Sequence, residues 1–457
     1  MKKIFSILFI ALLISSCNEL DRMSPNDVAA NHVFTSKEGA QSALIGLYSS
    51  MQSRDYYGGY YPMIADLYSD VGIDGGFDNV ALDEISVLAV TPSNIIAENT
   101  WLSIYYTIAT ANAIIANVDG ISDPNFVQSE KDHIKGQALA IRALAHFDLL
   151  RMFGEHWDNG SVYGIPVVTT VQKAGDVVTR SSVSVTYAAI ISDLNDADGL
   201  IDPADRSHAF INPIAVQGLL ARVYLYKGDK VNAIAAATNA INDGTFTLLD
   251  ANNFKGIYTT KFSTESIFEL AFDVQNRSAF NAVTYSRTDA LRTEVLFLAE
   301  EGMNQFFINR PGDRRSELMD FVNNDPSISP DGRSQKYRGE EKRDNSAFII
   351  RIAEVYLIRA EANGLTQAGV DDYNMVRTNR GLSGENVSDF ALAADFLDAV
   401  LDERKAELNF EGHRMFDLAR TGKINAVLGI DAFRSIFPIP YRETIATDGA
   451  IKQNPGY

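Results

Sequence analysis

The segment from Arg54 to Asn79 concentrates residue types that suit the binding of a polyhydroxylated ligand. It reads RDYYGGYYPMIADLYSDVGIDGGFDN, with aromatic rings, carboxylates and an amide close together. A sugar presents C–H groups on its ring faces and hydroxyls at its edges, so exposed aromatic planes beside polar side chains suit it. The paired glycines disfavour a continuous helix and favour loops. We predict ligand contacts from Tyr56, Tyr57, Tyr60, Tyr61, Asp70, Asp74, Phe77, Asp78 and Asn79.

Two other interpretations of this segment remain open. The tyrosines beside Pro62 can instead pack in the core with their hydroxyls hydrogen-bonded. Asp74 and Asp78 offer two carboxylates for calcium, but their spacing lacks the ligand series and the glutamate of an EF-hand. The single cysteine, Cys17, leaves no cysteine-built zinc site and no internal disulfide. We therefore predict no metal and no cofactor.

A second candidate segment, DVQNRSAFNAVTYSR at 273–287, also mixes aromatic and polar residues. From it we predict ligand contacts by Arg277, Phe280 and Tyr285, with Gln275 and Asn276 beside them. A third candidate group consists of Arg314, Arg315 and Tyr337. Tyrosine and arginine bind peptides as well as sugars, so the residue types leave both kinds of ligand open.

Residue patterns typical of enzymes are missing from the sequence. The six histidines include no HExxH pair, and neither a G-x-S-x-G motif nor a phosphate-binding glycine loop is present. A glycosidase needs only two carboxylates at a suitable separation, which an acidic chain does not rule out. The 59 acidic and 40 basic residues give a net charge of −19. Such a surface repels phosphate backbones, which disfavours nucleic acid as a partner.

The N-terminus has the layout of a secretory signal that ends in a lipidated cysteine. Two lysines precede the apolar run Ile4–Ile14, and two serines stand directly before Cys17. The apolar run is shorter than the roughly 20 residues that a membrane-spanning helix needs. We predict a signal peptide at 1–16 and a lipidated N-terminus with a polar tether at 17–34. A plain signal peptide with an incidental cysteine is the alternative.

Much of the remaining chain has the periodicity of helices. In GQALAIRALAHFDLLRMFG, apolar residues recur at helical spacing. Small and large residues alternate in GLLARVYLYKGDKVNAIAAATNAI as they do in a tetratricopeptide helix pair, and IRIAEVYLIRAEA repeats the start of that pattern. We predict helix pairs at about 213–243 and 348–380. The segment between them has weaker periodicity, and long irregular segments are often functional.

The predicted helix FLDAVLDERKAELNF carries Arg404 in the middle of an apolar stripe. A buried guanidinium needs a carboxylate partner to offset its desolvation. Glu407, Glu411 or Glu354 is predicted to supply it. A structural ion-pair network is favoured over a catalytic role for this cluster.

The order of these motifs resembles the SusD/RagB family of Bacteroidetes outer-membrane lipoproteins over essentially the full chain. The matching pieces are the cysteine signal, WLSIYYTIATANAIIANV, GQALAIRALAHFDLLRMFGE followed by GIPVV, AVQGLLARVYLYKGD, IIRIAEVYLIRAEA, ERKAELNFEGHRMFDLARTG and FPIPYRETIATDGAIKQNPGY. The resemblance implies a mainly α fold, in which tetratricopeptide-like helix pairs pack against an irregular, loop-rich half. It implies one such domain over residues 35–457.

The same resemblance implies a non-enzymatic, lipid-anchored protein on the outer face of the outer membrane. It would serve as a hinged lid for a SusC-like TonB-dependent transporter and capture nutrient, with a glycan favoured. The alternatives are a RagB-like peptide-binding subunit and a helical-repeat adaptor that contacts only its transporter. A glycan-cleaving enzyme comes third. No ligand-binding residue of the family carries over by motif match.

Overall fold

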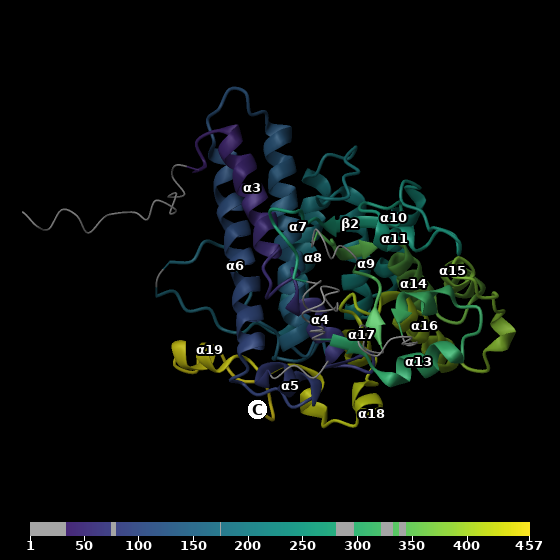
Figure 1. The fold of residues 1–457 in the computed structure, drawn as a ribbon. Coiled ribbons are helices and arrows are strands. Elements are labelled where there is room, and N and C mark those ends of the chain that lie inside the picture. Colours follow the sequence, from purple (N-terminus) through teal and green to yellow (C-terminus); the bar gives the residue numbers. More distant parts are fainter. Residues whose placement is uncertain (1–32, 75–78, 174, 280–296, 321–331, 338–343) are drawn as a thin grey trace, which may run out of the picture.

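Helices dominate the computed structural model of the protein (Figure 1). The described residues are 33–457 without 75–78, 174, 280–296, 321–331 and 338–343. The predicted fold class, mainly α, is confirmed. The predicted signal peptide and most of the tether, with Cys17, lie outside the described residues.

Four long helices form one side of the molecule (Figure 1). They are α3 (Lys37–Met51), α6 (Ile95–Asn117), α7 (Gln128–Phe153) and α8 (Val183–Leu200). Helix α7 packs against both α6 and α8, and α3 packs against α6. Polar side chains begin three of these helices: Ser36, Asn94 and Ser182 each accept a backbone N–H from the first turn.

Two helix pairs occupy the positions predicted for tetratricopeptide-like units, and the first of them packs against α8. They are α9 (Pro213–Lys227) with α10 (Lys230–Asn242), and α14 (Ile352–Asn363) with α15 (Gln367–Thr378). The second pair begins after 348 because Ala347–Arg351 forms a strand. Gly228 turns the chain between α9 and α10 at φ +82°, a conformation that glycine adopts without steric cost. Helix α10 packs on α14, so the two pairs adjoin.

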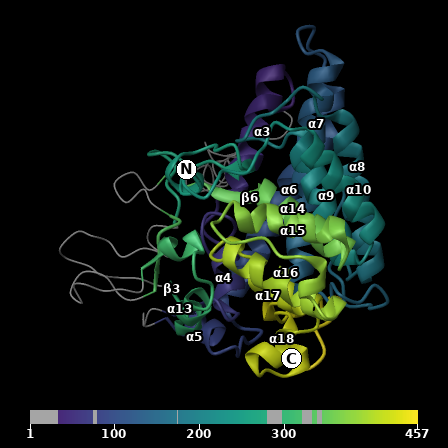
Figure 2. The same cartoon turned by 90° about the vertical axis from the view of Figure 1, so that its right-hand side faces the viewer.

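The other elements are mostly short, and several lie on the side of the molecule away from α7 and α8 (Figure 2). The helices are α4 (Tyr60–Leu67), α5 (Val80–Ser86), α11 (Gly256–Thr259), α13 (Glu301–Ile308), α16 (Ala393–Leu408), α17 (Arg414–Arg420), α18 (Ile424–Leu428) and α19 (Tyr441–Ala446). Four 3₁₀ turns are described, at Val118–Gly120, Arg314–Leu318, Val387–Asp389 and Ala432–Ser435.

Among the described residues, the strands form three two-stranded antiparallel sheets. Strand β1 (Gly72–Asp74) pairs with β3 (Phe297–Ala299), β2 (Ser266–Leu270) with β6, and β4 (Met319–Asp320) with β5 (Arg333–Ser334). Every residue of β2 and of β6 (Ala347–Arg351) is buried. This sheet therefore belongs to the core, and β6 leads directly into α14.

Buried arginines and glutamates join the helix pairs to the strands and to α16. Arg222 on α9 pairs with Glu354 on α14 at 2.6 Å, and both side chains are 1% exposed. Glu407 on α16 pairs with Arg351 and with Arg380, each at 2.9 Å. Coulomb attraction and hydrogen bonds offset the desolvation of these charges, whereas removing one partner would leave the other uncompensated.

Arg404 lies in the same buried region, which confirms its structural interpretation. Its main partner is Asp417, at 2.7 Å, and Glu354 lies 3.7 Å away. The predicted partners Glu407 and Glu411 pair with other cations instead. Asp417 was missed because it belongs to the next helix, α17, which the chain folds back against α16.

The C-terminal region also returns to the N-terminal one. Helix α17 packs against α4, and the Gly412 N–H donates to Asp66 at 2.7 Å. These two residues are 346 positions apart. Asp66 is fully buried, and burial raises its pKa to about 7 although Gly412 and Lys336 oppose that shift.

Candidate functional site

The four predicted tyrosines lie in the core and not on the surface. Tyr56, Tyr57, Tyr60 and Tyr61 are 0, 5, 8 and 1% exposed. The prediction that their rings form an exposed binding face is therefore wrong, and the alternative of core packing holds. Gly58 helps the loop fold inward, because a Cβ there would lie 2.2 Å from the Gln52 carbonyl oxygen.

Asp148 on α7 is the reason that this segment turns inward. The hydroxyls of Tyr56 and Tyr57 donate to Asp148 Oδ2 at 2.6 and 2.8 Å, and Arg151 pairs with Oδ1 at 2.5 Å. Burial and the Asp148 carboxylate raise the pKa of Tyr56 well above its ordinary value, so the phenol stays neutral. Asp148 lies 92 positions from Tyr56 along the chain, so the residues around Tyr56 do not predict this contact.

Asp70, another predicted contact, is an ion-pair partner. It pairs with Arg414 at 2.6 Å and with Lys405 at 2.7 Å, and its side chain is 23% exposed. Burial alone would raise the pKa of Asp70, but the two cations lower it to about 2. This carboxylate therefore fastens α17 and α16 to the segment after α4, which leaves little of it for a ligand.

The other predicted residues of this segment have mixed outcomes. Asp74 is half-buried at the end of β1, where its N–H donates to Ser86 Oγ. Asn79 caps α5 by accepting the N–H groups of the next turn. Phe77 and Asp78 lie outside the described residues.

The second predicted segment contacts the first. The Ala279 N–H donates to the Gly58 carbonyl at 2.9 Å, and the Asn276 amide donates to Gln52 Oε1. Arg277 is exposed, and its Nε donates to the Val274 carbonyl. Two segments that were predicted separately as ligand contacts thus meet at one surface. Phe280 and Tyr285 lie outside the described residues.

The third predicted group contributes mainly to the interior. Arg315 is buried and pairs with Glu403 at 2.6 Å, and Tyr337 is buried and donates to the Phe410 carbonyl at 2.5 Å. The side chain of Arg314 is 39% exposed and pairs with Glu317 three residues on. No contact that the structure describes joins these side chains to the other two predicted segments.

A polar hollow adjoins the surface where the first two segments meet. It has a volume of about 640 Å³ and lies between α3 and α6. The residues that line it are Gly46, Ser49, Ser50, Ser53, Asp55, Asn99, Leu102, Ser103 and Tyr106. Ser53 directly follows Gln52 in the chain and Asp55 lies three residues after it, so the hollow is next to that surface.

Tyr106 gives the polar hollow an accessible aromatic ring. Its side chain is 66% exposed, in contrast to the buried tyrosines of the neighbouring loop. The half-buried Asp55 has a pKa raised by burial, with Arg54 opposing the shift. Asn99, one helical turn from Ser103 and two from Tyr106, adds an amide. This hollow therefore combines a ring plane with acceptor and donor groups, the combination that sugar binding requires.

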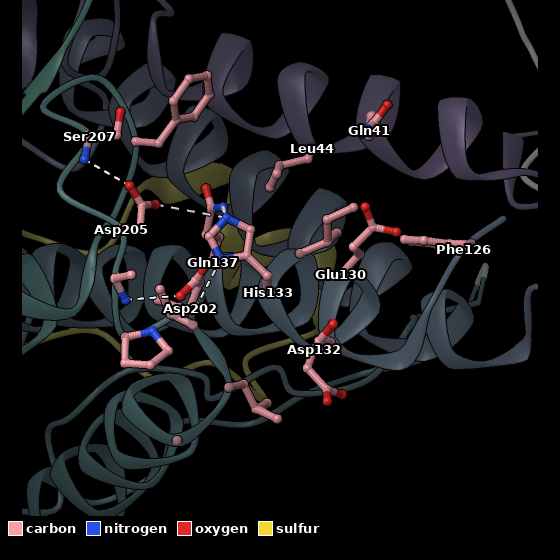
Figure 3. A pocket seen from close by; sticks show the side chains of 18 of the residues that line it. Gln41, Leu44, Phe126, Glu130, Asp132, His133, Gln137, Asp202, Asp205 and Ser207 are labelled. Atoms are coloured by element: carbon pink, nitrogen blue, oxygen red, sulfur yellow. Dashed lines mark hydrogen bonds and ion pairs between the residues drawn. The ribbon is translucent and has the colours of Figure 1, made fainter.

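A larger cavity than the polar hollow lies elsewhere, at the N-terminal ends of α3 and α7 (Figure 3). We call it the acidic groove; its volume is about 970 Å³. Leu44, Phe126, Ile134 and Ile201 are buried along it. Carboxylates also line it, from Glu130, Asp132, Asp202 and Asp205. Lys37 pairs with Glu130 at 2.5 Å, whereas the other three have no lysine or arginine ion pair with the described residues.

His133 organises the middle of the acidic groove. The Asp202 N–H donates to His133 Nδ1 at 3.1 Å, and His133 Nε2 lies 3.8 Å from Asp205 (Figure 3). The buried Gln137 lies 2.8 Å from the same ring nitrogen, and its Oε1 accepts the Tyr48 hydroxyl at 2.6 Å. An apolar floor with an acidic wall favours a ligand that carries positive charge.

Within the described part of the chain, no group of acidic, histidine or cysteine side chains has the arrangement of a metal site. None of the helices described there is long and apolar enough to cross a membrane.

Two family models match the chain. One, described as "Starch-binding associating with outer membrane", matches residues 20–225. The other, the SusD family, matches residues 327–432. Together they span both the long helices and the second helix pair with α16 and α17.

Relatives and solved structures agree with these models. SusD-like protein P2 of Formosa agariphila is 26% identical, and the match covers 100% of both chains. A crystal structure of a putative sugar binding protein from Bacteroides vulgatus is 27% identical with a TM-score of 0.80, over 93% of this chain and 99% of that one. A laminarin binding SusD-like protein has a TM-score of 0.77 at 23% identity, over 93% and 100% of the two chains.

Proposed function

Because this chain belongs to the SusD/RagB family, we propose that it is a surface-exposed lipoprotein that captures an oligosaccharide for a SusC-like TonB-dependent importer. As a member of that family it is a binding protein and not an enzyme. The carbohydrate class of ligand is supported by the starch-binding family description and by the sugar-binding and laminarin-binding neighbours.

The proposed anchor is a lipid on Cys17. It is supported by the apolar signal before that residue and by the outer-membrane association of the matching family. Cells grown with labelled palmitate should label the wild-type protein, and the Cys17→Ser variant should carry no label and leave the membrane fraction. Equal labelling of both proteins would contradict this anchor.

The proposed partner is a SusC-like transporter. Affinity purification of the membrane-anchored protein should bring down one abundant barrel protein of that type. The helical-repeat adaptor remains the competing role: in that case the transporter would co-purify, but the purified lipoprotein would bind no saccharide.

The exposed ring of Tyr106 in the polar hollow carries the proposal for the ligand site. It lies with Asp55 and Asn99 in a hollow next to the surface where Gln52 meets Asn276. A pyranose face stacked on this ring would place its hydroxyls among the carboxylate, the amide and the serine hydroxyls. Of the side chains predicted as contacts, Arg277 adjoins this surface and belongs to the same proposed site.

Calorimetric titration with laminarin and starch oligosaccharides tests this site. Tyr106→Ala should weaken binding about tenfold, equal to about 1.4 kcal/mol, because an aromatic stacking plane is lost. Tyr441→Ala is the matched control, since Tyr441 is also exposed, at 57%, but lies on α19. If both variants bind as wild type does, the polar hollow is not the site; if wild type binds no saccharide, the ligand class is wrong.

Peptide binding is the second candidate function, and the acidic groove favours it. Three of its carboxylates lack a lysine or arginine partner among the described residues, so they attract a cationic segment whose apolar residues can lie on Leu44 and Ile134. Titration with a library of lysine-rich peptides should then show binding that falls in the double variant Asp202→Asn/Asp205→Asn and weakens with salt. Binding of oligosaccharides alone would remove this candidate.

A further inference from the structure

The two helices that enclose the polar hollow are uncharged over most of their length. No residue of α3 from Gly39 to Met51 carries a charge, and none of α6 does from Asn99 to Asn117. These helices pack against each other, and the hollow lies between them (Figure 1). In the whole chain 22% of the residues are charged, so the walls of the hollow differ in composition from the rest of the protein.

Asp55 is the one charged residue among those that line the hollow. Its side chain is partly exposed and makes no ion pair with any residue that the structure describes. Burial raises the pKa of Asp55, and Arg54 offsets this shift only in part. The carboxylate therefore contributes a negative charge that its surroundings do not neutralise.

The hollow has no lysine, arginine or histidine among the described residues that line it. Two arginines belong to the adjoining segments, and both have other contacts. Arg54 Nη2 donates to the Tyr60 hydroxyl at 2.8 Å, and the guanidinium lies 4.9 Å from the centroid of that ring. Arg277 Nε donates to the Val274 carbonyl. A negatively charged ligand would thus find no cation on the walls of the hollow.

These charges separate two classes of sugar. A sugar carboxylate or sulfate in the hollow would lose water and face Asp55, whereas protein sites for such groups usually supply arginine or lysine. The hydroxyls of a neutral sugar can donate to Asp55. They can also bind Ser49 and Asn99, whose side chains have no hydrogen bond with the described residues. The ring of Tyr106 offers a stacking surface to either class.

We propose that the polar hollow selects uncharged oligosaccharides, and that Asp55 is the residue that excludes sugars carrying carboxylate or sulfate groups. Like charges a few ångströms apart repel strongly where water is partly excluded, so one carboxylate is enough to discriminate. This inference rests on the proposed function and narrows its ligand to neutral glycans.

Calorimetric titration with two matched probes tests this selection. One probe is a glucose oligosaccharide from laminarin or starch, and the other is its C6-oxidised form, in which carboxylates replace the primary alcohols. In about 20 mM salt, wild type should bind the neutral probe about tenfold more tightly than the oxidised one. In about 500 mM salt the ratio should fall to about threefold, because salt screens charges at a protein surface.

Variants of Asp55 identify the residue responsible. Asp55→Asn should lower the low-salt ratio to about threefold by strengthening the binding of the oxidised probe, and Asp55→Lys should reverse the preference. Glu38→Gln is the matched control, because it removes one negative charge from an exposed residue in the first turn of α3, outside the hollow. This control should keep the wild-type ratio.

The outcomes distinguish this inference from the proposed function. If wild type binds the oxidised probe as tightly as the neutral one, or if Asp55→Asn and Glu38→Gln give the same ratio, the inference is overturned while oligosaccharide binding stands. If wild type binds neither probe, the proposed function itself is contradicted, and the inference with it. The salt series needs only wild-type protein, so a ratio that does not change with salt overturns the inference even if the Asp55 variants fail to fold.

Discussion

Three buried tyrosines and one exposed tyrosine lie in neighbouring parts of this protein. Tyr56, Tyr57 and Tyr61 point inward and surround Asp148 and Arg151, with ring centroids 4.5–5.5 Å apart. Tyr106 on α6 is 66% exposed and lines the polar hollow. The residue type is the same, and the partners differ.

The difference indicates that a buried charge determines whether nearby tyrosine side chains are buried or exposed. Asp148 and Arg151 are 0 and 2% exposed, so their desolvation has to be offset by hydrogen bonds, and phenol hydroxyls supply them. Among the residues that the structure describes, none with a buried charge hydrogen-bonds the Tyr106 hydroxyl, and the Tyr106 side chain stays exposed. Substitution of the buried tyrosines should therefore lower the stability of the fold, and substitution of Tyr106 should lower the affinity for the ligand.

The largest effect should follow from removing the charge itself. Asp148→Ala leaves Arg151 and two tyrosine hydroxyls without their partner, and we expect the free energy of unfolding to fall by about 3–5 kcal/mol. Urea unfolding followed by circular dichroism measures it. Asp196→Ala, an exposed aspartate on α8, should stay within about 0.5 kcal/mol of wild type. A small effect for Asp148→Ala would break the comparison.

Asp70→Asn should have the next largest effect, and it should depend on pH. The folded-state pKa of about 2 lies below the ordinary aspartate value of 3.8, so the ion pairs stabilise the fold above about pH 4 and lose their effect as the pH falls toward 2. We expect a loss of about 2 kcal/mol at neutral pH that vanishes near pH 2. Unfolding curves across this range measure it, with Asp398→Asn, whose side chain is 56% exposed, as control.

Removing one hydroxyl from a buried tyrosine and one from the exposed Tyr106 tests the comparison further. Tyr57→Phe loses its hydrogen bond to Asp148, so we expect a loss of stability of about 1.5 kcal/mol, as for hydrogen bonds to charged groups. Tyr106→Phe removes an exposed hydroxyl and should leave stability unchanged. Thermal unfolding of the two variants gives both values; equal shifts would mean that burial does not separate the groups.

Arg277→Ala should give the smallest effect. The side chain is exposed and makes only one described hydrogen bond, so stability should not change. If it contacts the ligand at the edge of the proposed site, oligosaccharide affinity should fall about threefold, the range of a solvent-exposed contact. Calorimetric titration measures this, and unchanged affinity would place Arg277 outside the site.

The helix pairs of the fold were predicted from local sequence patterns, and the structure contains them. Small residues and Gly228 indicated the turn and close packing of α9 and α10, and the same spacing 132 positions later indicated α14. The pairing of Arg222 with Glu354 spans that same separation. The helices could be predicted because helix periodicity and turn residues act over short distances or recur in the sequence, whereas the pairing of Arg222 with Glu354 was not predicted.

The candidate site was harder to predict because exposure depends on distant partners. Nothing near Tyr56 indicates Asp148, and nothing near Arg404 indicates Asp417 as its main partner. Tyr106 was missed because it belongs to a motif taken as scaffold. A signal was present: Trp101, Ile104, Ile108 and Ala111 form the apolar stripe of α6, and Tyr106 lies off it.

The hydrogen bond between Gly412 and Asp66 has a consequence for the order in which the chain folds during synthesis. A ribosome completes α4 long before Gly412, which donates to Asp66 Oδ2, emerges, so this hydrogen bond of α4 forms only when the last tenth of the chain has been made. Shortened products that end before this glycine would expose an acid amid apolar surface, and quality-control proteases would recognise them as unfinished.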